Sequence, residues 1–170
     1  MTPLVAALAA LAVVGLLCCS AFFSSAETAI VSLPSEWVAA QSRAKDSRVA
    51  TLQRLYDDPH RLLVTLLVGN NVVNIAISSI ITAVLVDALP SGVAVVAATL
   101  VASIVLLVFG EIVPKSYGLG NATRWSLVVA GPLRLVERAL SPAITVLDWI
   151  TRRMSALIPV DAEIEKPYLD

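Results

Sequence analysis

Long apolar runs alternate with polar stretches along the chain, and this pattern predicts three helices that cross a membrane. A transmembrane helix needs about 20 consecutive, mostly apolar residues. Three segments meet that requirement, at residues 3–33, 62–86 and 92–113. The segment Asp87–Gly92 contains Pro90 and predicts a tight turn between the second and third spans.

A further apolar region, residues 121–158, predicts a helix of another kind. Arg134, Glu137 and Arg138 fall near its middle, and two prolines interrupt it. A charged group at the bilayer centre costs about 2.5–3.5 kcal/mol even on the most lenient insertion scale. An amphipathic helix lying along the cytoplasmic membrane surface is therefore favoured over a fourth span.

The placement of basic residues predicts the orientation of the three spans. Loop 34–61 and the region after the third span carry the Lys and Arg residues, whereas the N-terminus and the Asp87 turn carry none. Cytoplasmic segments are enriched in Lys and Arg, so we expect the N-terminus outside and the C-terminus in the cytoplasm. The first apolar run has no basic residue before it, so we expect mature structure from Leu4 onward rather than a signal peptide.

Composition agrees with a membrane protein and excludes several other classes. Of the 170 residues, 58% are apolar and 15% charged, against about 45–50% and 25% in soluble domains. The 12 basic and 13 acidic residues give no indication of nucleic-acid binding, and the adjacent Cys18 and Cys19 imply no disulfide framework. No Walker loop, zinc-ligand spacing or nucleophile with a base partner is present, so we do not expect an enzyme.

Several polar side chains interrupt the predicted spans at helical spacing. Asn70 and Asn74 are four residues apart and share a helix face, as do Ser20 and Ser24 in the first span. Glu111 lies near the end of the third span, three residues before a proline that removes a backbone donor. A carboxylate inside a span is a functional candidate.

Two interpretations of these polar residues stay open. Small and polar residues commonly join membrane helices by hydrogen bonds worth roughly 0.6 kcal/mol each, and Ser25, Asn71, Ser78, Ser79 and Ser103 fit that role. Alternatively, hydroxyl, amide and carboxylate oxygens form the ligand set of a hard cation such as Mg²⁺. The candidate ligands are Ser20, Ser24, Asn70, Asn74 and Glu111, with a carbonyl freed by a helix opening at Gly69. Glu27 is either a further carboxylate for ions or the partner of Lys115.

Three motifs resemble the membrane domain of the CorB/CorC and cyclin-M family of magnesium transporters. They are 20-SAFFSSAETAIVSL-33, 66-LLVGNNVVN-74 and 109-FGEIVPKSYG-118. The resemblance implies an all-α domain over residues 1–160 with three transmembrane helices, a cytoplasmic juxtamembrane belt helix and a homodimer in the plasma membrane. It also implies Mg²⁺ export driven by Na⁺ entry. The cation ligands implied are Ser20, Ser24, Gly69, Asn70, Asn74 and Glu111, without settling which serine contacts the ion.

The end of the chain departs from the family pattern. Family members continue into a paired CBS module that binds ATP, whereas residues 161–170 form a polar segment that we expect to be the start of a linker to that module. ATP regulation is therefore not expected within these residues. The alternative function is a membrane-embedded Mg²⁺ sensor or scaffold that regulates other transporters and moves no ion itself.

Overall fold

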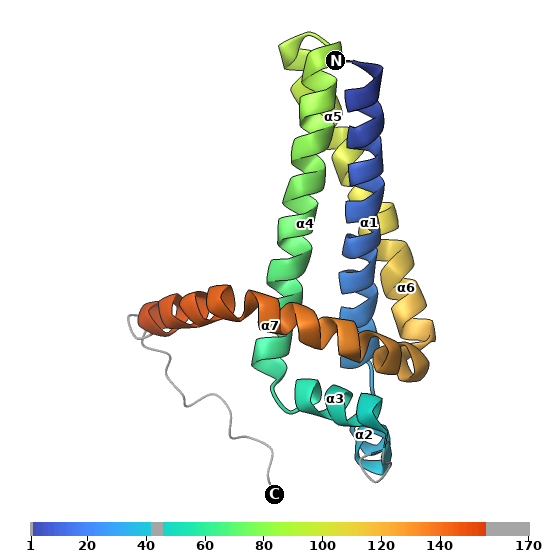
Figure 1. The fold of residues 1–170 in the computed structure, drawn as a ribbon, viewed down its shortest axis with the longest axis vertical. Helices are drawn as coiled ribbons and strands as arrows, with labels where there is room; N and C mark the ends of the chain where they lie inside the picture. Colours follow the sequence, from blue (N-terminus) through green and yellow to red (C-terminus); the bar gives the residue numbers. More distant parts are fainter. Residues whose placement is uncertain (1, 42–45, 156–170) are drawn as a thin grey trace, which may run out of the picture.

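Three long apolar helices stand side by side in the computed structural model, which describes residues 2–41 and 46–155 (Figure 1). The first is α1 (Pro3–Val31) and the second is α4 (Pro59–Ala88). The third runs from Ser91 to Gly120. All three are long and apolar enough to cross a membrane, which confirms the predicted number of spans.

The third long helix consists of three parts in continuous succession. These are α5 (Ser91–Val105), a π-helix, η1 (Leu106–Ile112), and α6 (Val113–Gly120). In η1 the backbone N–H of Val113 donates to the carbonyl of Val108, five residues back. The chain passes Pro114 by widening the preceding turn and continues as a helix to Gly120, beyond the predicted span.

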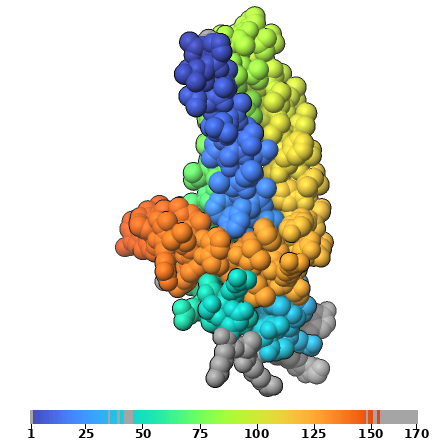
Figure 2. Space-filling view, turned by 45° about the vertical axis from the view of Figure 1, so that its right-hand side comes forward, coloured from blue at the N-terminus to red at the C-terminus, as the bar shows by residue number. Residues whose placement is uncertain are grey.

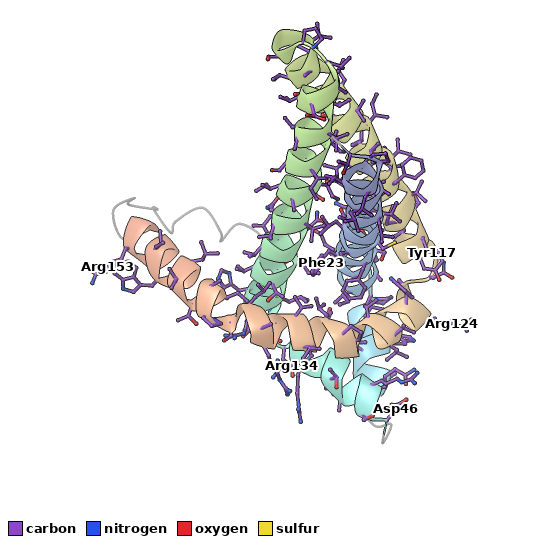
Figure 3. The ribbon with its side chains drawn as sticks, turned by 45° about the horizontal axis from the view of Figure 1, so that its top comes forward. Phe23, Asp46, Tyr117, Arg124, Arg134 and Arg153 are labelled. Carbon is purple, nitrogen blue, oxygen red and sulfur yellow. The ribbon has the colours of Figure 1, made fainter. Side chains whose placement is uncertain are left out.

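Glycines let α1 approach both of its neighbours closely. A Cβ atom at Gly69 on α4 would lie 2.6 Å from Cζ of Phe23, whose ring is buried and faces α4 (Figure 3). A Cβ atom at Gly118 on α6 would overlap the backbone carbonyl of Ser25 on α1. Small residues at such crossings allow the dispersion contacts that hold membrane helices together.

Three amphipathic helices gather at one end of the bundle. They are α2 (Ser35–Gln41), α3 (Ser47–Tyr56) and α7 (Ala122–Ser155), and the N-terminus and the α4–α5 turn lie at the opposite end (Figure 1). The buried side chains of α3 are Val49, Leu52 and Leu55, which share one face of that helix.

Helix α7 crosses the ends of the upright helices and extends beyond α4 (Figure 1). On the face shown in Figure 2 it lies between α3 and the upper part of the bundle, while α3 also contacts α4. Its buried residues include Val129, Leu133 and Ile144, whereas Trp149 is 60% exposed. α7 is not among the helices apolar enough to cross a membrane in the described ranges. An amphipathic helix was predicted here; its position at a membrane surface stays a prediction, and residues 156–158 lie outside the described residues.

One charged residue of α7 is buried. Glu137 lies on the face of α7 that packs on the bundle. Its two carboxylate oxygens accept hydrogen bonds from Arg61 Nε, at 2.6 Å, and Arg134 Nη1, at 2.7 Å. Arg61 also donates to the hydroxyl of Ser141 on α7, at 2.7 Å. Burial is tolerated because each carboxylate oxygen has a cationic donor.

Glu137→Gln should weaken the attachment of α7 to α4. The amide keeps one acceptor but turns an N–H₂ group toward one of the two arginines, so we expect a loss of about 2 kcal/mol in the free energy of unfolding. Chemical unfolding in detergent micelles measures it. Glu36→Gln, on the exposed surface of α2, is the matched control and should change stability by less than about 0.5 kcal/mol. Equal stability of the two variants would contradict this role of Glu137.

Candidate functional site

The centre of the bundle contains a hydrogen-bonded cluster of the predicted polar residues. Ser20 on α1 is fully buried, and its Oγ lies 2.7 Å from Oδ1 of Asn74 and 3.2 Å from Oδ1 of Asn70 on α4. The two asparagines reach the same hydroxyl because they are one helical turn apart. The single hydroxyl proton of Ser20 satisfies only one of these oxygens at a time. Three oxygen atoms therefore meet with one hydroxyl proton among them.

The third helix reaches the same cluster through its backbone. A Cβ atom at Gly110, within η1, would lie 2.8 Å from Ser20 Oγ. Only glycine leaves room for the hydroxyl at this distance. Pro114, one turn later, has no N–H, so one carbonyl in the π-helical turn lacks its backbone donor. π-helical turns are frequent at functional sites, and here the turn lies against the Ser20 hydroxyl.

Glu111 follows Gly110 directly, on the same π-helical turn. Its side chain is partly exposed, and no residue in the described ranges forms a hydrogen bond or ion pair with it. The structure thus places the backbone of residue 111 beside the cluster. Contact between its carboxylate and Asn70 or Asn74 stays a prediction.

Ser24 lies one helical turn from Ser20 on α1 and is also fully buried. Its hydroxyl is the buried side-chain oxygen that has no hydrogen-bond partner among the residues the structure describes. An unpaired buried hydroxyl costs about 1–3 kcal/mol. Such a group calls for a partner that the protein itself does not supply, and a cation or a water molecule would meet that need.

The expected opening of α4 at Gly69 is absent, since α4 is continuous from Pro59 to Ala88. That part of the prediction was wrong. Glycine weakens a helix by about 1 kcal/mol, but the Phe23 ring packs on Gly69 and fills the space that a side chain would take. In this structure the glycine serves close packing rather than exposing a carbonyl.

Two open alternatives are decided by contacts at the α7 end of the bundle. Glu27 pairs with Lys115, with 3.5 Å between Oε2 and Nζ and both side chains well exposed. The ion-pair alternative is confirmed for Glu27. Ser25 accepts a hydrogen bond from the Trp125 indole N–H at 3.0 Å, which confirms its packing role.

An open surface of α4 adjoins the cluster, and the sequence pattern missed it. It consists of Asn71, Asn74, Ser78, Ser79 and Thr82 together with apolar side chains of the same helix. Asn74 belongs both to this surface and to the Ser20 cluster. Positions 70, 74, 78 and 82 repeat every four residues, which is the signal that would have extended the polar stripe to Thr82. Ser78, Ser79 and Thr82 each donate to a carbonyl one turn back on their own helix.

The chemistry available in the cluster is that of oxygen ligands. No group of three or more His, Cys, Asp or Glu side chains gathers as a metal site within residues 2–41 and 46–155. The cluster instead offers hydroxyl and amide oxygens beside a π-helical turn, with one carboxylate next in sequence. Such a set suits a hard cation rather than a soft transition metal.

The sequence matches one protein family and several known proteins. Residues 11–170 match the family described as the cyclin M transmembrane N-terminal domain. The chain is 31% identical over 150 residues to a chloroplastic DUF21 domain-containing protein of Arabidopsis thaliana. It is 30% identical over 152 residues to a UPF0053 protein of Synechocystis, and 28% identical over 146 residues to the UPF0053 inner membrane protein YfjD of Escherichia coli.

These alignments cover most of this chain but only part of each relative. They span 88%, 88% and 85% of the chain, and 22%, 44% and 34% of the three relatives in the same order. The shared part is the membrane domain. These alignments therefore do not assign the activity of a whole relative to this chain.

Ser20→Ala and Ser24→Ala should affect stability in opposite ways when divalent cations are removed with a chelator. Ser20→Ala removes a hydroxyl that joins α1 to α4, so we expect unfolding to become easier by about 1 kcal/mol. Ser24→Ala removes an unpaired buried hydroxyl, so we expect stability to stay equal or rise. Thermal unfolding in detergent micelles compares the pair. A Ser24→Ala variant as destabilised as Ser20→Ala would mean that the Ser24 hydroxyl is paired.

Proposed function

Because the chain belongs to the CorB/CorC and cyclin-M family, we propose that it is the membrane domain of a transporter that exports Mg²⁺ from the cytoplasm in exchange for Na⁺. The observation that carries the proposal is the meeting of the Ser20, Asn70 and Asn74 oxygens with the η1 backbone at Gly110. Oxygen atoms from two helices thus meet beside the backbone of the widened turn in the third.

The Ser20–asparagine distances are those of hydrogen bonds, and they also fit the separation of neighbouring Mg²⁺ ligands. Mg²⁺ prefers six oxygens at about 2.0–2.1 Å in octahedral geometry, which sets neighbouring ligands about 2.9 Å apart. The distances from Ser20 Oγ to Oδ1 of Asn74 and of Asn70 are 2.7 and 3.2 Å, on either side of that value. Small movements would therefore convert this cluster into part of a coordination shell.

Each remaining candidate has a distinct role in the proposal. Glu111 supplies the negative charge that neutral hydroxyl and amide ligands lack. Ser24, whose buried hydroxyl has no partner in the described part of the chain, supplies a further oxygen. Gly69 gives Phe23 the space to pack between α1 and α4, and its carbonyl becomes available only if α4 opens there.

The distribution of charge supports a cytoplasmic position for α7. Arg48, Arg54 and Arg61 lie at the end of the bundle that α7 crosses, whereas Thr2 and the Asp87 turn lie at the other end (Figure 1). The positive-inside rule then gives an external N-terminus and a cytoplasmic C-terminus. We place the protein in the plasma membrane as a homodimer, with α7 as the belt helix. The Escherichia coli relative is named as an inner membrane protein, which agrees with this location.

Transport requires that the site opens to each side of the membrane in turn. A carrier releases its ion when a second conformation binds it less tightly. The η1 turn is the natural place for such a change, because its backbone hydrogen bonds are already rearranged around Pro114. Na⁺ entry would supply the driving force by favouring the conformation that has released Mg²⁺.

Efflux of Mg²⁺ from loaded, sealed liposomes tests the proposal. Glu111→Gln removes the charge and Asn74→Ala removes an oxygen ligand, so we expect both variants to lose efflux down to the level of protein-free liposomes. Thr99→Ala is the control, because Thr99 is exposed on α5 and bonds only within its own helix, so this variant should keep wild-type efflux. The variants should elute from size-exclusion chromatography as the wild type does.

Two results would contradict the proposal in different ways. Unchanged efflux in both Glu111→Gln and Asn74→Ala would remove the site assignment. Absence of efflux with the wild-type chain, although it binds Mg²⁺, would favour the alternative of a Mg²⁺ sensor or scaffold that moves no ion itself.

A further inference from the structure

A polar hollow lies where α3, α4 and α7 meet, apart from the oxygen cluster. Its volume is about 520 Å³, and four arginines line it: Arg54 from α3, Arg61 from α4, and Arg134 and Arg138 from α7. Arg134 lies where α7 crosses the base of the bundle (Figure 3). The carboxylates in its lining are Asp57, Asp58 and Glu137, so the hollow carries an excess of positive charge.

Most of that negative charge is already engaged within the protein. Both oxygens of Glu137 accept hydrogen bonds from Arg61 and Arg134. Asp58 caps the N-terminus of α4, where its Oδ1 accepts from the backbone N–H of Arg61 at 3.1 Å, and the helix dipole stabilises its charge. Asp57 is the lining carboxylate without an ion pair among the described residues.

The arginines, in contrast, keep unused donors. Arg54 and Arg138 are exposed and form no ion pair with any residue in the described ranges. Arg61 and Arg134 each retain 32% of their side-chain surface exposed while bound to Glu137. An arginine has five N–H donors in a planar fork that matches phosphate oxygens. The hollow therefore offers several guanidinium groups from three helices to one anion.

The surroundings of the hollow indicate the source of that anion. Arg61 immediately precedes the apolar run of α4, and Val72, eleven residues later, shares its helix face by the 3.6-residue period. On this face Val64 and Val68 are partly exposed and Thr65 is buried. Farther along, Val72 is 59% exposed and Ile75 is 66% exposed, so apolar surface opens beyond the arginines on a helix long enough to cross a membrane. A soluble anion makes no use of such a surface, whereas a phospholipid covers it with an acyl chain.

We propose that this hollow binds the phosphate of an anionic phospholipid headgroup, with the acyl chains lying along α4. Basic pockets at the cytoplasmic ends of membrane helices are suited to such headgroups. The site is separate from the oxygen cluster and does not depend on ion transport. A bound lipid would bridge α3, α4 and α7 and so hold α7 against the bundle.

Lipid binding measured by native mass spectrometry tests this site. The chain in detergent micelles is titrated with dioleoyl-phosphatidylglycerol and, separately, with dioleoyl-phosphatidylcholine. We expect the phosphatidylglycerol adduct to be favoured about tenfold, and the Arg54→Gln/Arg138→Gln double variant to lose that preference. These two arginines are chosen because neither holds the Glu137 carboxylate. Each single variant should show part of the loss, which keeps the test valid if the double variant is unstable.

The control variant Arg48→Gln/Arg124→Gln removes the same amount of charge. Both arginines are exposed, lie at the same end of the bundle as the hollow, and are outside its lining. It should keep the preference for phosphatidylglycerol. An equal loss in this control would reduce the effect to general electrostatic attraction and overturn the site. Displacement of phosphatidylglycerol by excess inorganic phosphate would identify a soluble-anion site instead, and equal binding of both lipids by the wild type would also contradict the proposal.

Discussion

A polar side chain inside a bundle of apolar helices has no water nearby, so the bundle, or something the bundle binds, has to pair it. The contact between Ser20 on α1 and the asparagines on α4 meets this requirement in part. It also leaves more oxygen acceptors than protons at one point. The hydroxyl of Ser24, one turn away, is left without any partner in the described part of the chain. These oxygens are the basis of the proposal that the bundle binds a cation.

Close backbone approach makes the oxygen cluster possible. Gly110 admits the Ser20 hydroxyl, Gly69 admits the Phe23 ring, and Gly118 admits the carbonyl of Ser25. α1 therefore packs between α4 and the third long helix, and its serines are buried. At the base of the bundle, the buried carboxylate of Glu137 is stabilised by two arginines. One bundle thus pairs its polar groups in two ways, by shared protons at its centre and by ion pairs at its base.

Patterns within one helix were predictable from the sequence, whereas contacts between distant segments were not. Apolar length predicts the three spans, and four-residue spacing predicts that Asn70 and Asn74 act together. One partner of Glu137 is Arg61, 76 residues away, so periodicity within α7 gives no sign of this buried ion pair. The π-helix depends on hydrogen bonds five residues apart, and Pro114 predicted only that the backbone changes nearby. Gly69 was misjudged because the Phe23 ring that packs on it comes from another helix.

Isothermal titration of the purified chain with Mg²⁺ tests the central claim most directly, namely that oxygens from three helices form one divalent-cation site. The account predicts saturable binding of Mg²⁺ by the wild type, weaker binding of Na⁺ and Ca²⁺, and loss of the Mg²⁺ heat in Glu111→Gln. Identical Mg²⁺ binding by the wild type and Glu111→Gln, or no binding by either, would contradict it.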